Sequence, residues 1–111
     1  MLVRAQTSSG GGGGNITFSE AVAPLSNNTA TLTVDGKSDA YIVNTMTDAT
    51  AYWSGCNITS VVNGTATLIS EATYGADKAK TWSVYPTTKG STVTINFGLP
   101  QAFKWITAVN C

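Results

Sequence analysis

The sequence contains no histidine and few charged residues. Lys and Arg together number six, Asp and Glu together number six, and these four types make up 11% of the chain, against about 25% in an ordinary globular protein. Without histidine, neither a triad with an imidazole base nor the commonest metal ligand is available. A formal net charge of zero also provides no basic patch for nucleic acid or an anionic surface. We therefore expect no nucleic-acid partner and no cofactor.

Long apolar runs are missing as well. No stretch approaches the roughly 18 continuous apolar residues that cross a bilayer, so we expect no membrane insertion. Residues 1–6 are too short for a secretory signal peptide. If the protein is exported, the sequence is that of a mature or recombinant form.

Small hydroxylated residues stand where charges are usually found, since the chain has 18 Thr and 10 Ser. Its 111 residues suit one domain, because domains most often run to roughly 100–150 residues. Residues 7–14, Thr-Ser-Ser and five Gly, offer no side chain that anchors in a core. We expect a flexible arm or a linker added by cloning over 1–14, and a single β domain over 15–111. The alternative is an ordered arm whose glycines lie flat against a neighbouring subunit.

The two cysteines, Cys56 and Cys111, lie 55 positions apart, which fits neither a zinc site nor a Cys-x-x-Cys redox motif. The simplest prediction is one disulfide, which in the loop-entropy model stabilises the fold by roughly 4 kcal/mol. It would clamp the C-terminus and indicate an extracellular or cell-surface location. The alternative is two free thiols in a cytosolic protein.

Four Asn-x-Thr sequons are candidate N-glycosylation sites, at Asn15, Asn27, Asn57 and Asn63. Chance predicts about two in a chain with this content of Asn, Ser and Thr. The excess is modest, so the sequons agree with a secreted glycoprotein without establishing one.

Apolar and polar residues alternate in short runs that are typical of strands. The clearest is 91–97, with Val93, Ile95 and Phe97 on one face. Asp35-Gly36, Asn63-Gly64 and the segment 86–90 separate pairs of such runs and predict three hairpins. In the first hairpin a three-residue loop with a bulge would place Leu32 opposite Ala40. The runs are 15–18, 30–34, 40–44, 57–62, 65–69, 81–85 and 91–97.

Two segments are harder to assign. In 101–110, Phe103, Trp105, Thr107 and Val109 would form a strand face. Phe103, Ile106 and Asn110 would instead share a helical face. Branched residues favour a last strand. Residues 70–80 contain Tyr-Gly in mid-segment, which predicts a loop. In total, about seven short, mostly antiparallel strands predict an all-β fold, either a β-sandwich or a small barrel.

Catalytic constellations are scarce, and we expect no enzyme. Cys56 has neither a His nor a cation near it in sequence, so a structural half-cystine is the better interpretation. Residues 35–39, Asp-Gly-Lys-Ser-Asp, lack the alternate acids of a calcium loop and predict a turn rather than a metal site. The acids lie in predicted turns or at strand ends, where they are ordinarily solvated: Glu20, Asp35, Asp39, Asp48, Glu71 and Asp77.

Aromatic residues provide the candidate ligand site. Tyr52, Trp53 and Tyr74 fall in predicted loops, and exposed aromatic rings stack on sugars in carbohydrate-binding modules. The simpler interpretation of the other rings, Trp82 and Trp105, is that they lie in strands and pack in the core. A carbohydrate-binding or adhesive module is therefore the alternative function.

A structural role is the preferred function. Low charge, abundant Thr and many short strands suit an extracellular surface filament or coat subunit that associates with copies of itself or with another surface protein. Few charges leave sheet edges poorly guarded, so a neighbour's strand could add there, and the candidate assembly arm is Asn15, Ile16, Thr17 and Phe18. Together with Cys111, this composition resembles the β-rich head domains of pilins. A secreted effector or inhibitor that binds another protein is the remaining alternative.

Overall fold

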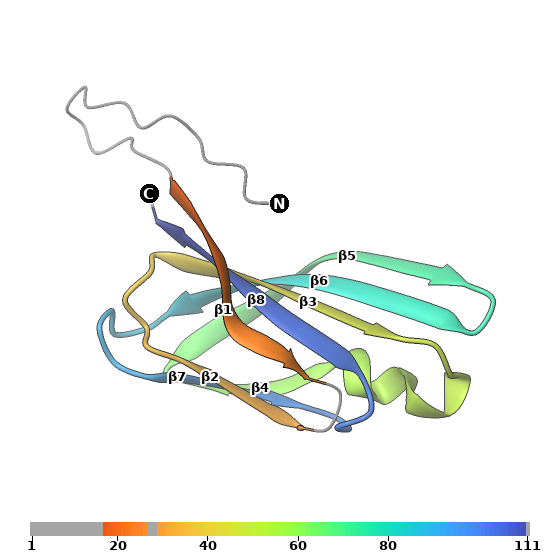
Figure 1. Ribbon diagram of the computed structural model, residues 1–111. Coiled ribbons are helices and arrows are strands. Elements are labelled where there is room, and N and C mark those ends of the chain that lie inside the picture. The colour runs from red at the N-terminus through yellow and green to blue at the C-terminus, as the bar shows by residue number, and fades with distance from the viewer. Residues whose placement is uncertain (1–16, 27–28, 111) are drawn as a thin grey trace.

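The computed structural model describes residues 17–26 and 29–110. They form two antiparallel sheets packed together, so the chain is a β-sandwich and the predicted fold class is confirmed (Figure 1). The elements in chain order are β1 (Thr17–Ser26), β2 (Thr31–Val34), β3 (Ala40–Thr47), the 3-10 helix η1 (Thr50–Cys56), β4 (Ile58–Val62), β5 (Gly64–Tyr74), β6 (Asp77–Pro86), β7 (Val93–Phe97) and β8 (Phe103–Asn110).

The larger sheet has the order β1-β8-β3-β6-β5, and the smaller one has the order β2-β7-β4. The edges of the larger sheet are therefore β1 and β5, while β3 lies at its centre. Residues 1–14, the predicted arm, are outside the described part of the chain.

The three predicted hairpins are wrong. Strand β2 pairs with β7, with Leu32 opposite Ile95 rather than Ala40, and β4 also pairs with β7. Asp35-Gly36, Asn63-Gly64 and the segment 86–90 each carry the chain from one sheet to the other. The physical reason is that strands of both sheets in a sandwich alternate inward and outward in the same way, so alternation does not identify the pairing partner.

The hairpin that does form joins β5 to β6 around Gly75 and Ala76. It covers residues 70–80, so the predicted loop there is wrong. From Thr67 to Tyr74 every residue of β5 is exposed, which leaves no alternation of buried and exposed positions for the sequence to display. The strand is held by its ladder to β6 rather than by a buried face.

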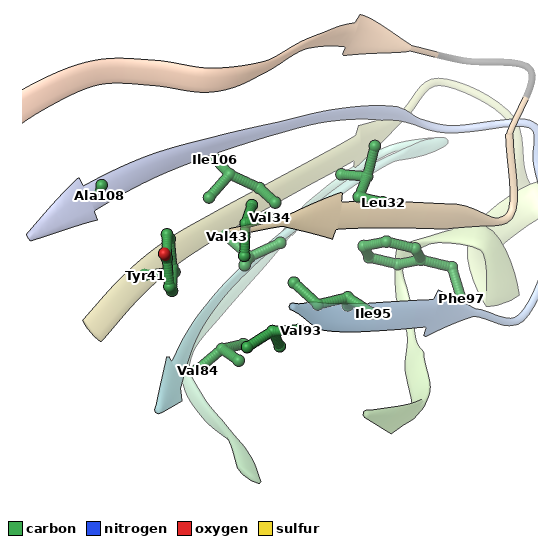
Figure 2. Close-up of a cluster of buried hydrophobic side chains, with 10 residues drawn as sticks. All are labelled: Leu32, Val34, Tyr41, Val43, Val84, Val93, Ile95, Phe97, Ile106 and Ala108. Carbon is green, nitrogen blue, oxygen red and sulfur yellow. The ribbon is translucent and has the colours of Figure 1, made fainter. Parts of the chain in front are cut away.

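The core lies between the sheets (Figure 2). Val93, Ile95 and Phe97 point into it, as the alternation predicts. The last segment is a strand, but its buried face is the one with Lys104, Ile106 and Ala108 rather than the Phe103 face. The buried cluster consists of Leu32, Val34, Tyr41, Val43, Val84, Val93, Ile95, Phe97, Ile106 and Ala108.

The turn after β2 is built on Asp35. Its carboxylate accepts hydrogen bonds from the Lys37 backbone N–H and the Tyr41 hydroxyl, both at 2.9 Å. The Lys37 N–H is the main cause that holds the Asp35 pKa below its ordinary value, and the Tyr41 hydroxyl is the second. This carboxylate therefore anchors a turn, and Lys89 forms an ion pair with the neighbouring Asp39.

Candidate functional site

The structure brings together Tyr52, Trp53 and Tyr74, the three residues of the candidate ligand site. The first two lie on η1, and the third ends β5. The Trp53 indole N–H donates to the Ala76 carbonyl at 2.8 Å, which ties η1 to the tip of the β5–β6 hairpin (Figure 1). Tyr52 is 43% exposed and Tyr74 is 86% exposed. Residues 22 positions apart in sequence thus share one end of the molecule.

Trp53 is less available than its two neighbours. It is half-buried, and the Lys78 ammonium lies 4.6 Å from the centre of its ring. That distance is within the range of a cation–π contact. The indole therefore supports the hairpin tip, while the two tyrosines present the exposed aromatic surface.

A group of charged residues on the same hairpin was not recognised from the sequence. Lys78 Nζ lies 2.6 Å from one carboxylate oxygen of Glu71, and Lys80 Nζ lies 3.6 Å from the other. The Lys78 hydrogen bond is the main cause that lowers the Glu71 pKa, and the Lys80 charge is the next. Two Lys at alternate positions share a strand face, but this signal is useful only once the hairpin is known.

Lys80 also reaches out of its own sheet. Its Nζ donates to Asn57 Oδ1 at 2.5 Å, and Asn57 directly precedes β4 of the smaller sheet. Beside it, the Trp82 indole N–H donates to the Cys56 carbonyl at 3.3 Å. These contacts connect η1, β4 and β6 at one margin of the sandwich.

Cys56 carries a free thiol, contrary to the predicted disulfide with Cys111. It is fully buried, and its carbonyl accepts from the Thr45 hydroxyl at 3.1 Å. Strand register places Thr45 opposite Lys104, whereas the far end of β8, at Val109, lies opposite Ala40. Cys56 thus packs beside the beginning of β8 and not beside its end. Cys111 itself lies outside the described residues.

We expect the Cys56 thiol to react slowly in the folded protein. Burial is the main cause that raises its pKa, and the thiolate is the reactive form. In a Cys111→Ser variant, a soluble disulfide reagent should label Cys56 at least roughly a hundredfold more slowly in buffer than in denaturant. Equal rates in the two conditions would contradict the buried position.

The sequons that fall on described side chains are engaged in internal contacts. Asn57 bonds Lys80. The Asn63 amide nitrogen donates to the Thr88 and Ser91 carbonyls, both at 3.1 Å, and its oxygen accepts from the Thr88 N–H at 2.8 Å. A glycan on the Asn63 nitrogen would disturb its bonds to the Thr88 and Ser91 carbonyls, so the structure does not favour glycosylation at Asn63. Asn15 and Asn27 lie outside the described residues.

The candidate assembly arm is described in part. Thr17 and Phe18 begin β1 and pair with Asn110 and Val109 of β8, whereas Asn15 and Ile16 lie outside the described residues. The β1–β8 pairing contains three register shifts, while β3 and β6 pair without a shift. The first strand is therefore an irregularly paired edge of the larger sheet.

No protein-family model, no curated protein and no solved structure matches the chain. Among residues 29–109, whose side chains the structure describes, no group of three or more Cys, Asp or Glu could hold a metal ion. No helix in the described part is long and apolar enough to cross a membrane. Two open depressions in that part, one beside Asp35 and one beside Trp82, are lined by residues other than Tyr52, Trp53 and Tyr74.

Proposed function

We propose that the chain is a structural domain of a surface assembly, whose copies join by adding strands at the edges of the larger sheet. The observation that carries the proposal is β5, an edge strand of 11 residues. On it, Leu68 is 41% exposed and Ile69 is 56% exposed. A long exposed edge strand with apolar side chains is a template for another strand.

Lys and Pro, two of the usual guards of an edge strand, are absent from β5. Natural edge strands carry these residues, which prevent pairing with another chain. Its single acid, Glu71, is already paired with Lys78 and Lys80 of the same hairpin. One bulge, between Leu68 and Ser70, guards the edge locally. Apart from Glu71, the residues of β5 carry no charge that would repel an added strand.

The partner that we propose for β5 is a second copy of this chain. The opposite edge of the sheet, β1, is irregularly paired with β8, which supports the segment Asn15–Phe18 and the rest of β1 as the strand that is added. Joining β1 of one copy to β5 of the next would continue the sheet from copy to copy. An extracellular location stays a prediction from composition, because the free Cys56 thiol removes the disulfide argument for it.

The test is the mass of the particle in solution, measured by sedimentation velocity over a range of concentrations. We expect the full chain to form oligomers, and we expect both removal of residues 1–18 and Ile69→Lys to shift it to monomer. Met46→Lys is the control, because Met46 is 42% exposed but lies on the central strand β3. A monomeric full chain at every concentration would overturn the proposal.

Carbohydrate binding is the second candidate function. The hydrogen bond from the Trp53 indole to the Ala76 carbonyl at the hairpin tip favours it. This hydrogen bond holds two exposed tyrosines, Tyr52 and Tyr74, on adjoining elements. A glycan array should show binding that Tyr74→Ala weakens by roughly tenfold, since a lost aromatic contact costs on the order of 1–1.5 kcal/mol. Tyr85→Ala, at a 53% exposed position on β6, is the matched control. Absence of any bound glycan, or an equal effect of both variants, would exclude this function.

A further inference from the structure

Lys80 and Asn57 meet where the two sheets come together. Lys80 lies on β6 of the larger sheet, and Asn57 directly precedes β4 of the smaller one. The lysine Nζ lies 2.5 Å from Asn57 Oδ1. The amide carbon is bonded to that oxygen, so the Lys80 nitrogen lies beside an electrophilic carbon. This nitrogen becomes a nucleophile when the ammonium loses a proton.

The surroundings hold both groups in place. The Asn57 backbone N–H donates to the Ser54 carbonyl at 3.1 Å, and its carbonyl accepts from the Gly98 N–H at 2.9 Å. The Lys80 side chain is only 14% exposed, and its ammonium lies 5.9 Å from the centre of the Trp82 ring. Holding two reactants in contact replaces a bimolecular encounter by an intramolecular step, which accounts for much of a reaction barrier.

Glu71 supplies the third group. One of its carboxylate oxygens lies 3.6 Å from Lys80 Nζ, and the other accepts from Lys78 Nζ at 2.6 Å. Lys78 therefore holds the Glu71 carboxylate beside Lys80, where the carboxylate can accept a proton. The lysine lies on β6 and the carboxylate on β5, while the asparagine directly precedes β4.

We propose that Lys80 and Asn57 form an intramolecular isopeptide bond, with Glu71 as the proton acceptor. The carboxylate takes a proton from the Lys80 ammonium, and the free amine attacks the Asn57 amide carbon. The Nζ–Cγ bond forms and the Cγ–Nδ2 bond breaks, and the proton held by Glu71 passes to the departing amide nitrogen. The Glu71 carboxylate then takes the second proton from the attacking nitrogen and releases it to solvent. The products are a secondary amide and one molecule of ammonia, so the step needs no oxidant or cofactor.

Such a bond would join the two sheets covalently and, unlike a disulfide, would not respond to a reductant. Its formation releases the Asn57 amide nitrogen, to which an N-linked glycan would be attached, so glycosylation at this sequon and cross-linking exclude each other. Because only the free amine attacks, the reaction should become faster as the pH rises. The inference is independent of the proposed assembly, since it concerns contacts within one copy.

The test is the intact mass of the purified full chain after prolonged incubation at mildly alkaline pH. We expect a loss of about 17 Da, the mass of one ammonia molecule. Tandem mass spectrometry of a protease digest should then show one branched peptide that contains both Asn57 and Lys80. A wild-type protein that keeps its full mass, or that lacks this peptide, overturns the proposal without any variant.

The variants separate this reaction from succinimide formation at Asn63-Gly64, which also releases ammonia. Lys80→Arg keeps the positive charge but cannot form the amide, so it should keep its full mass. Glu71→Gln should slow the loss by at least roughly tenfold, the size of effect that a positioned proton acceptor contributes. Lys89→Arg is the control, because Lys89 pairs with Asp39 rather than with the proposed group, and this variant should still lose ammonia. A loss of mass that persists in Lys80→Arg would assign it to another site and overturn the proposal.

Discussion

Gly36→Ala is expected to lower the free energy of unfolding by roughly 3 kcal/mol or more, because it combines backbone strain with a steric clash. Gly36 has a φ of 75°, in the left-handed region that disfavours other residues. A Cβ built on it would lie 1.8 Å from the Ser91 carbonyl oxygen. Its own carbonyl accepts from the Gly90 N–H at 2.8 Å, so the turn cannot move away without losing that bond.

Gly75→Ala is the matched control for this prediction. Gly75 has a φ of 60°, but nothing lies within 4 Å of the Cβ that would be added. The left-handed conformation alone costs roughly 1–2 kcal/mol, so the difference between the two variants isolates the clash with Ser91. Urea unfolding followed by tryptophan fluorescence measures both values. Equal destabilisation by the two substitutions would show that the loops of 35–39 and 86–92 do not touch as described.

Lys104→Glu should be the other strongly destabilising substitution, with a loss of roughly 3–5 kcal/mol. Lys104 is completely buried, and its ammonium donates to the Pro100 carbonyl at 3.0 Å and the Ala102 carbonyl at 3.1 Å. A carboxylate cannot donate to carbonyls, so it would be buried facing two acceptors. Lys104→Met should cost less, about 1–3 kcal/mol, since it leaves the carbonyls without a donor but buries no charge. Equal stability of wild type and Lys104→Glu would contradict the buried position.

The same burial predicts a pH dependence. Desolvation lowers the Lys104 pKa from its ordinary value of 10.5, so between the lowered value and 10.5 the unfolded chain binds more protons than the folded one. Stability should therefore rise with pH across that window. Burial raises the Cys56 pKa above its ordinary value of 9.0, so this thiol makes stability fall as the pH rises above 9.0. Comparing wild type with Lys104→Met in urea at several pH values separates the two, because only the lysine contribution is removed. If wild type and Lys104→Met differed in their free energy of unfolding by the same amount at every pH, the prediction would be contradicted.

The candidate site shows which functional residues can be predicted from local sequence patterns and which cannot. Tyr52, Trp53 and Tyr74 could be chosen from the sequence because loops and strand ends expose aromatic rings, but only the hairpin turn at Ala76 brings η1 and β5 together. The Glu71, Lys78 and Lys80 group could not be found while residues 70–80 were interpreted as a loop. Lys104 was missed because a lysine in an apolar run is ordinarily exposed, and its partners are backbone carbonyls that carry no sequence signal.

The sequence by itself determined the all-β class and the inward face of its clearest strand, because a period of two in Val93, Ile95 and Phe97 depends only on neighbouring residues. The tertiary structure alone decided which strands pair and which polar groups meet between the sheets. It also decided that Cys56 carries a free, buried thiol. The reason is physical. Backbone hydrogen bonds are the same for every residue pair, so the choice between a hairpin and a crossing to the other sheet depends on long-range packing. Asp35-Gly36 and Asn63-Gly64 have the composition of hairpin turns but join different sheets.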